Sequence, residues 1–191
     1  MSPVAQAKPK VQNLRDALAR LIEEKALFQG EFKSPSGGRS DYYIDMAMIF
    51  TEPTGLEIVI NLTLSELGKL QVDKIASPSV EADPIVAVVG IHAKLGSLFI
   101  HHGQPIYAYE KLENLLSGGK KVVIIADATF GGHTILAAAG ALRSAGAEVR
   151  TAITLVDLQK GAQDLLGHNG IQLVPLIEAK DITLPGKRLT P

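Results

Sequence analysis

The chain has 191 residues with 19 basic and 20 acidic side chains, and 46% of its residues are hydrophobic. This size and composition predict one globular domain with a substantial core, and they exclude a disordered or collagen-like chain. The net charge of -1 provides no basic surface for nucleic acid, and the lack of cysteine excludes disulfides and thiolate metal sites. No apolar run reaches the roughly 18–20 residues of a membrane span, and the first ten residues lack the apolar segment of a secretory signal. We therefore expect a cytoplasmic protein that binds neither nucleic acid nor membrane.

Hydrophobic periodicity predicts the elements of the N-terminal part of the chain. Apolar residues near a 3.6-residue spacing predict an amphipathic helix at 11–28. Turn residues dominate 29–38, and the β-branched and aromatic residues of 41–50 indicate one or two strands. A second amphipathic helix is expected at 53–70, with Thr54 as its N-cap.

The rest of the chain alternates short apolar runs with helical stretches. Repeated strand–helix units favour an α/β fold with a mainly parallel sheet. The run Val122–Ile125 is continuous and β-branched, which is typical of a strand buried on both faces of such a sheet. We expect a single domain at residues 11–180, between a flexible tail at 1–10 and a loose tail at 181–191.

The most informative segment follows this strand. The strand is expected to end at Asp127, a short loop contains Gly131 and Gly132, and a helix is expected to begin at Thr134. A strand, an acid, a glycine-containing loop and a helix N-terminus together present backbone N–H groups and a helix dipole to an anion. An ordinary strand-to-helix turn, in which the glycines only permit tight geometry, accounts for the spacing about equally well.

A second candidate segment, residues 28–45, combines turn residues with adjacent aromatic residues. Its turn chemistry allows Tyr43 to lie beside a flat ligand. A hairpin with half-buried tyrosines accounts for the same residues.

These two segments and four others resemble orotate phosphoribosyltransferases over about residues 11–175. In chain order the matching segments are ALFQGEF, SGGRSDYYID, EADPIVAVVG, GGKKVVIIADAT, ILAAAGALRSAGAEV, and TAITLVD followed by GA, LL and GI. The resemblance implies a type I phosphoribosyltransferase fold, with a five-stranded parallel core sheet, a small hood from the chain ends, and a homodimer. It also implies transfer of ribose 5-phosphate from phosphoribosyl pyrophosphate to orotate, with magnesium, in pyrimidine biosynthesis.

The resemblance suggests which residues form the site. The candidates for phosphate and ribose binding are Asp127, Thr129, Gly131, Gly132, His133 and Thr134. The candidates on the base side are Ser36, Gly37 and Tyr43. The catalytic residues stay unassigned, no metal site in the protein is expected, and the only cofactor expected is magnesium, if the protein is active.

Several positions depart from the family's pattern. Ala126 replaces one of two adjacent acids that hold the ribose hydroxyls. In the phosphate loop Phe130 replaces a hydroxyl residue, and His133 replaces a glycine. Glu81 stands where the pyrophosphate loop usually has glycine, and Leu158 stands where an arginine pairs with the orotate carboxylate.

The catalytic loop also departs from the family, whose members carry an arginine, two lysines and a histidine there. Residues 107–121 contain no arginine or histidine, and only Lys111 precedes the final pair Lys120 and Lys121. Losses of this kind add up to about 6 kcal/mol, or about 10⁴-fold in rate, after discounting for non-additivity. We therefore expect a catalytically impaired protein that binds a nucleotide, phosphate or protein partner. The alternative is an active orotate phosphoribosyltransferase in which these lysines compensate.

The five histidines show no metal-binding pattern in the sequence. His101 and His102 are adjacent, and neither a His-x₃-His pair nor a carboxylate-supported pair is evident. We therefore expect surface histidines, and we expect Asp83 and Asp157 to be turn or cap residues.

Overall fold

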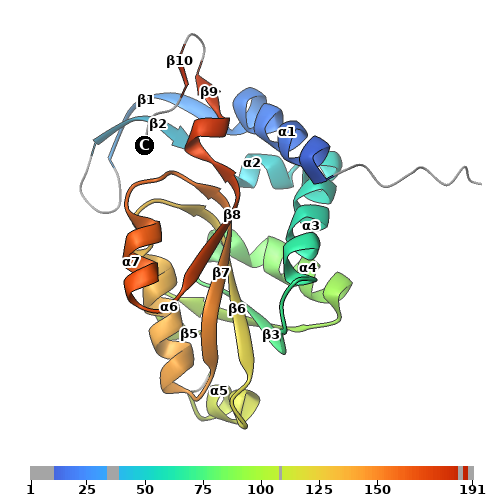
Figure 1. The fold of residues 1–191 in the computed structure, drawn as a ribbon, viewed down its shortest axis with the longest axis vertical. Coiled ribbons are helices and arrows are strands. Elements are labelled where there is room, and N and C mark those ends of the chain that lie inside the picture. The colour runs from blue at the N-terminus through green and yellow to red at the C-terminus, as the bar shows by residue number, and fades with distance from the viewer. Residues whose placement is uncertain (1–10, 34–38, 108, 185–186, 189–191) are drawn as a thin grey trace, which may run out of the picture.

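A central sheet with helices on both faces lies beneath a small hood built from the two ends of the chain (Figure 1). This computed structural model describes residues 11–33, 39–107, 109–184 and 187–188. The elements of the first half are α1 (Val11–Leu21), the π-helix η1 (Ile22–Ala26), β1 (Leu27–Lys33), β2 (Arg39–Ile44), α2 (Ala47–Phe50), α3 (Pro53–Leu67), β3 (Lys74–Ser77), η2 (Val80–Ala82), α4 (Asp83–Ala93) and β4 (Gly96–His101). Those of the second half are β5 (Gln104–Pro105), α5 (Tyr109–Leu116), β6 (Lys121–Thr129), α6 (His133–Ser144), β7 (Glu148–Asp157), α7 (Ala162–His168), β8 (Gln172–Glu178), η3 (Ala179–Asp181), β9 (Thr183–Leu184) and β10 (Lys187–Arg188).

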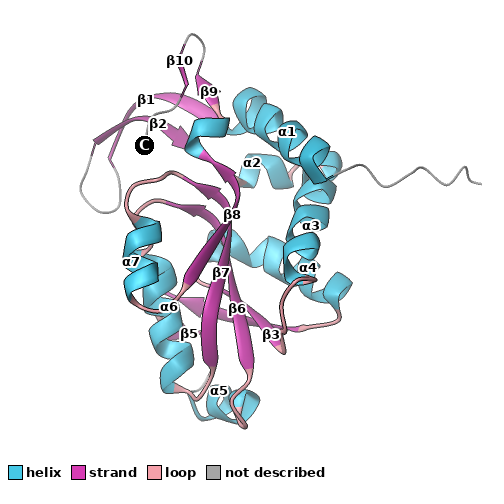
Figure 2. Ribbon diagram, viewed as in Figure 1, coloured by secondary structure: helices cyan, strands magenta, loops and turns pink. Residues whose placement is uncertain are grey.

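Five parallel strands form the sheet in the order β4-β3-β6-β7-β8, and β5 adds antiparallel to β4 at one edge (Figure 2). The predicted α/β fold with a mainly parallel sheet is therefore confirmed. The run Val122–Ile125 lies within β6, which pairs with β3 on one side and β7 on the other. This strand is central, as its continuous β-branched sequence predicted.

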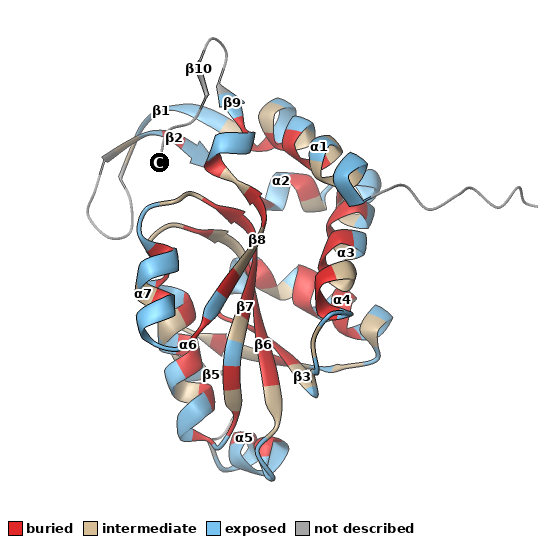
Figure 3. Cartoon of the chain, viewed as in Figure 1, coloured by how far each residue is buried: buried red, intermediate tan, exposed pale blue. Residues whose placement is uncertain are grey.

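Two apolar clusters cover the opposite faces of the sheet. Val123 and Ile125 belong to the cluster that α1, α3 and α4 complete, whereas Val122 and Ile124 belong to the cluster that α5, α6 and α7 complete. Figure 3 shows buried residues along β6 and β7 between these helices. Because each face has its own core, every residue of the run is buried, and the alternation between apolar and polar residues disappears.

The N-terminal segment differs from the predicted elements. The helix expected at 11–28 ends as an α-helix at Leu21 and continues as η1, and β1 occupies part of the segment predicted to be turns. β1 pairs antiparallel with β2, from Leu27 opposite Ile44 to Lys33 opposite Arg39. The pairing of β1 with β2 overrides the local helical period, and local periodicity carries no information about such pairing.

Two smaller predictions in this region are also corrected. Residues 47–50, expected to be strand, form the short helix α2. The N-cap of α3 is Glu52 rather than Thr54, because Pro53 takes the first helical position, where its missing N–H costs nothing.

The hood combines β1 and β2 of the N-terminal part with η3 and β9 of the C-terminal part above the sheet, as the resemblance implied (Figure 1). The backbone N–H of Thr183 donates to Glu23 Oε1 at 2.6 Å, and Ile182 is fully buried. Within residues 181–191, expected to be a loose tail, the structure describes β9 paired with β10. Residues 1–10 lie outside the described ranges. None of the helices in the described parts of the chain has the length and apolar character needed to cross a lipid bilayer.

The central strand generates a prediction about stability. Replacing the fully buried Ile124 with alanine removes apolar contacts on the α6 side of β6, and we expect the free energy of unfolding to fall by about 2–5 kcal/mol. The matched control is Ile106→Ala, at a side chain that is 58% exposed, with an expected change within about 0.5 kcal/mol. Urea denaturation measures both. Equal losses in the two variants would contradict the central position of Ile124.

Candidate functional site

The carboxyl ends of the parallel strands meet at the edge of the sheet that faces the hood, and the predicted phosphate segment lies there (Figure 1). β6 runs past Asp127 to Thr129, two residues further than predicted, because Thr129 still pairs with Asp157 of β7. The backbone N–H of Leu158 then donates to the Thr129 carbonyl at 2.9 Å. The following loop leads into α6, which begins at His133 rather than Thr134.

The loop between β6 and α6 requires glycine at position 132. Gly132 has a φ of +82° and is the N-cap of α6. A Cβ at this position would lie 3.2 Å from Leu166 Cγ and 3.3 Å from Ala162 Cα, so the loop packs directly against the start of α7. The N–H groups of the first turn of α6 have no partner within the helix and are available to an anion.

The other predicted phosphate residues differ in their availability. The Thr129 side chain is buried, and its hydroxyl donates to Thr154 Oγ1 at 2.8 Å, so it serves the β6–β7 contact. His133 and Thr134 are exposed on the first turn of α6, and a Cβ on Gly131 would lie 3.3 Å from the His133 ring. The exposed first turn of α6, rather than the hydroxyl of Thr129, is therefore the surface that a phosphate can reach.

Two carboxylates from other elements act on the carboxyl group of Asp127. Burial raises the pKa of Asp127 to about 6, backbone N–H groups oppose this shift, and the charges of Glu81 and Asp45 add to it. Glu81 comes from η2 after β3, and Asp45 follows β2 in the hood, where its Oδ1 accepts the N–H of Ala47 at 3.0 Å. We call Asp45, Glu81 and Asp127 the acidic edge.

An exposed group of aromatic side chains lies beside the acidic edge. Tyr43 on β2 is 50% exposed, stands opposite Phe28 of β1, and has its ring centroid 5.6 Å from that of Phe32. The pKa of the Tyr43 hydroxyl is raised by burial and then by Asp45, Asp127 and Glu81, which places this hydroxyl within the field of the acidic edge. We call Phe28, Phe32 and Tyr43 the aromatic face. The other two predicted base-side residues, Ser36 and Gly37, lie outside the described residues.

Magnesium is the metal that the resemblance implies, and the carboxylates of the acidic edge are the oxygen ligands it prefers. Within the described residues, however, no group of three or more histidine, cysteine, aspartate or glutamate side chains is placed to hold a metal ion. The acidic edge therefore fits magnesium only where a bound ligand supplies further oxygen atoms, as phosphate groups commonly do.

The segment expected to be a shortened catalytic loop is folded against the domain. His102 and Gly103, with φ of 51° and 74°, form a tight turn that joins β4 to β5. The N–H of Phe99 donates to the Tyr107 hydroxyl at 2.8 Å, and α5 buries Leu112 and other apolar residues in the core. In the described residues between β4 and β6, the chain thus forms a tight turn, β5 and the anchored helix α5.

One histidine departs from the expected surface position. His101, at the end of β4, is paired with Asp83 at the start of α4, with its Nε2 2.9 Å from Asp83 Oδ2. Both side chains are partly buried. The sequence hid this carboxylate-supported pair because 18 residues separate its members, and only the parallel pairing of β3 with β4 brings them together.

Sequence reasoning also missed part of the acidic edge and of the aromatic face. Asp45 is the last residue of the predicted segment 28–45, and its position directly after β2 is the available signal. The local pattern predicts a helix end at Phe28 and a turn at Phe32, and only the pairing of β1 with β2 brings these residues to one face.

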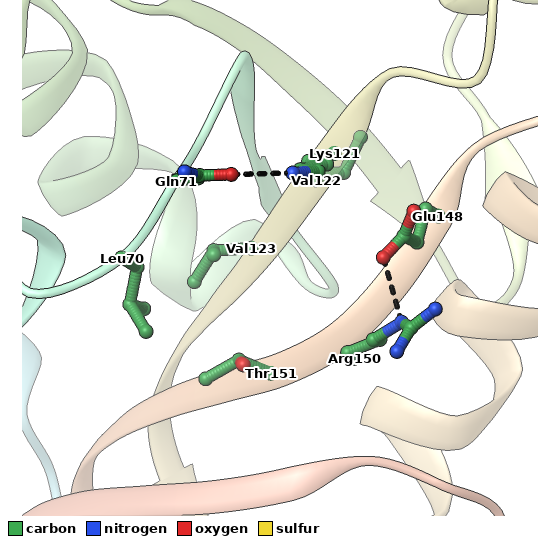
Figure 4. A pocket seen from close by; sticks show the side chains of 8 residues that line it. All are labelled: Leu70, Gln71, Lys121, Val122, Val123, Glu148, Arg150 and Thr151. Carbon is green, nitrogen blue, oxygen red and sulfur yellow. Dashed lines mark hydrogen bonds and ion pairs between the residues drawn. The ribbon is translucent and has the colours of Figure 1, made fainter.

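A pocket lies at the opposite edge of the sheet, where β6 and β7 begin (Figure 4). Its volume is about 190 Å³, and it contains none of the predicted site residues. Its charged groups are engaged with neighbours in its wall, since Lys121 Nζ donates to Gln71 Oε1 at 2.6 Å and Arg150 Nε lies 2.6 Å from Glu148 Oε1. We therefore place the functional site at the hood-facing edge.

Comparison with known proteins decides the family. No protein-family model matches the chain. It is 34% identical to the orotate phosphoribosyltransferase of Methanothermobacter thermautotrophicus over 172 residues, which are 89% of this chain and 94% of that protein. The chain belongs to the orotate phosphoribosyltransferase family. The enzyme of the same name from Methanopyrus kandleri is also 34% identical, over 88% of this chain and 91% of that protein.

Solved structures of this family share the fold. The crystal structure of orotate phosphoribosyltransferase from Aeropyrum pernix matches 84% of this chain and 93% of its own, with a TM-score of 0.73 and 25% identity. A phosphoribosyltransferase from Corynebacterium diphtheriae matches 89% of this chain with a TM-score of 0.73. The type I phosphoribosyltransferase fold is thus confirmed. The names of the relatives favour the active alternative over the impaired protein, because nothing in these comparisons shows a loss of activity.

The raised pKa of Asp127 generates a prediction about stability and pH. An acid whose pKa rises from 3.8 to about 6 on folding destabilises the folded protein once pH exceeds 3.8, and the cost is complete above pH 6. The Asp127→Asn variant avoids this cost, so we expect it to be more stable than the native chain at pH 7.5 by about 2–3 kcal/mol. The difference in unfolding free energy between the variant and the native chain should disappear as pH falls from 6 to 4. Urea denaturation at a series of pH values measures it, and a gap that does not change with pH would contradict the assignment.

Proposed function

We propose that this family member binds a phosphoribosyl ligand at the edge formed by β6 and α6. The observation that carries the proposal is Gly132, whose positive φ and close contact with α7 hold the first turn of α6 open to a phosphate. Asp127, near the end of β6, would accept hydrogen bonds from the hydroxyl groups of the ribose. Magnesium would arrive with the phosphorylated ligand and neutralise part of the acidic edge.

Transfer of ribose 5-phosphate to orotate is the activity that the relatives' names favour. In this chain the acidic edge opposes an anionic donor and an anionic acceptor, because like charges repel across a site of low dielectric constant. The segment from β5 through α5 also has Lys111 as its only cationic side chain, where several cations would be needed to stabilise a departing pyrophosphate. We therefore propose an orotate phosphoribosyltransferase-like protein in which ligand binding persists and transfer is slow.

A turnover assay separates slow transfer from full activity. With orotate, phosphoribosyl pyrophosphate and magnesium, we expect orotidine 5′-monophosphate to form at least about 10³-fold more slowly than with the Methanothermobacter thermautotrophicus enzyme under the same conditions. Ultraviolet absorbance follows the conversion of orotate. A rate within tenfold of that enzyme's rate would establish that the protein is fully active and would overturn the proposal of slow transfer.

Binding is tested separately with ribose 5-phosphate, which carries the phosphate and the sugar without a base. We expect calorimetry to detect binding, and we expect the Gly132→Ala variant to weaken it about tenfold because Cβ displaces the loop. The matched control is Gly146→Ala at the far end of α6, where φ is also positive but no atom lies within 4 Å of the added Cβ. Circular dichroism confirms that both variants fold. Absence of binding by the native chain would contradict the proposed function.

We also propose that the protein is a homodimer that uses the outer face of α4. Exposed or half-buried apolar residues repeat along this helix at a helical spacing, and Val80 precedes them: Pro84, Ala87, Val88 and Ile91. Ile91 is 77% exposed and Val80 is 60% exposed, which is unusual for aliphatic side chains unless another surface covers them. A second copy of the chain is the partner that the resemblance implies.

A charged substitution tests this interface. We expect the native chain to sediment as a dimer at micromolar concentration and the Ile91→Glu variant as a monomer, because a buried unpaired carboxylate is costly. The control is Leu115→Glu on α5, whose side chain is 44% exposed on a different surface and whose substitution should leave the dimer intact. A native monomer, or a dimer that survives Ile91→Glu, would contradict the proposed interface.

A further inference from the structure

Asp157, the last residue of β7, is a buried carboxylate in the loop that leads into α7 (Figure 1). Its side chain is 0% exposed. Burial raises the pKa of Asp157, hydrogen bonds from the backbone of Gln159 and the side chain of Gln163 lower it, and the charge of Glu178 raises it further. None of these described groups carries a positive charge. Because a buried charge is costly unless it is paired, Asp157 needs either a proton or a bound cation.

Two side-chain oxygen atoms of this loop lack a hydrogen-bond donor. Three buried side-chain atoms in the described part of the chain have no partner, and two of them are Asp157 Oδ2 and Gln159 Oε1. The same two residues are tied together, because the N–H of Gln159 donates to Asp157 Oδ1 at 2.9 Å, which is the turn role expected for Asp157. Gln159 has a φ of +55°, a costly conformation for a residue with a side chain. A short strained turn thus carries two unsatisfied acceptors.

The neighbouring groups have partners of their own. Glu178 of β8 lies opposite Asp157 in the sheet, but it is paired with Lys180 and forms a capping box with Asp181. The N–H of Leu158 donates to the carbonyl of Thr129 at 2.9 Å. The charge of Glu178 is therefore balanced within its own turn, whereas that of Asp157 is not.

We propose that Asp157 Oδ2 and Gln159 Oε1 hold a monovalent cation of the size of potassium, without its water. One carboxylate and one neutral amide oxygen match a single positive charge, and protein oxygen atoms can replace the hydration shell of potassium. Magnesium fits this place poorly, because it gives up water reluctantly and prefers several oxygen ligands in a strict octahedron. Within the described residues no group of three or more acidic, histidine or cysteine side chains is placed to hold a metal ion.

The ion would stabilise the loop on which the phosphate segment rests. A Cβ at Gly131 would lie 4.0 Å from the Lys160 carbonyl oxygen, and a Cβ at Gly132 would lie 3.3 Å from Ala162 Cα. The turn at Asp157 and Gln159 precedes both of these contacts in the chain. This role goes beyond the proposed function, and its effect on folding can be measured without any ligand.

Thermal unfolding in matched salts tests the cation. We expect the native chain to melt at least about 5 °C higher in potassium chloride than in choline chloride, both at about 0.1 M, because a site that binds only in the folded protein stabilises it. The two salts screen surface charges equally, so a difference reports a specific ion. Choline is too large for a buried site between two side chains.

Two variants assign the effect to this turn. Asp157→Asn removes the charge and should abolish the difference between the salts. Gln159→Met keeps the length of the side chain without its oxygen and should require about tenfold more potassium chloride for the same shift. The matched control is Asp164→Asn at an exposed residue of α7, which should keep the full difference. Circular dichroism confirms folding, and Gln159→Met still provides the test where Asp157→Asn does not fold.

Three results would overturn the proposal. The first is an equal melting temperature of the native chain in the two salts. The second is a salt difference that persists in the folded Asp157→Asn variant. The third is a stability that depends on pH and not on potassium, with the pH dependence lost in Asp157→Asn, because a proton then balances Asp157. None of these readouts uses ribose 5-phosphate, so their failure leaves the proposed function standing.

Discussion

The site depends on the rule that parallel strands all end at the same edge of their sheet. β3, β6 and β7 are joined by helices that return the chain to the opposite edge, so their carboxyl ends meet beneath the hood. Glu81 and Asp127, 46 positions apart in the sequence (127 − 81), come together for this reason. The hood adds Asp45 and the aromatic face from above, although β1 and β2 form a sheet of their own. Without the parallel order, Glu81 and Asp127 would not lie at the same edge.

The geometry of the loop before α6 and the charges around it have opposite effects on the binding of an anion. The loop before α6 keeps the glycine geometry that an anion needs, since Gly132 can hold no side chain without displacing α7. The surroundings of that loop work against a polyanion, because Glu81 and Asp45 add negative charge beside Asp127, whose pKa is raised first by burial and then by these two charges. The geometry of the loop therefore favours an anionic ligand, whereas the nearby carboxylates oppose one. Packing within the fold preserves the geometry of the loop, whereas substitution of a single surface residue changes the charge of the site.

The central sheet could be predicted from the sequence because each strand of it is a short apolar run between helices. Val122–Ile125 is the clearest case, since burial on both faces leaves a continuous pattern. The hood could not be predicted in this way, because Phe28 and Phe32 acquire their strand conformation from pairing with β2 rather than from their own period. The pair of His101 with Asp83 could not be predicted for the same reason, because a contact between distant segments leaves no pattern in the local sequence. Asp127 was found because its strand, loop and helix follow one another without interruption.

The turn at His102 and Gly103, together with the buried leucines of α5, has a consequence for solvent at the site. A covering loop in a group-transfer enzyme excludes water while a reactive sugar intermediate exists. In this chain the corresponding segment is held by the pairing of β4 with β5 and by Leu112 and Leu116, both fully buried, so closing it over the ligand would require these contacts to break. A lid formed by this segment would therefore cost the β4–β5 pairing and the burial of two leucines.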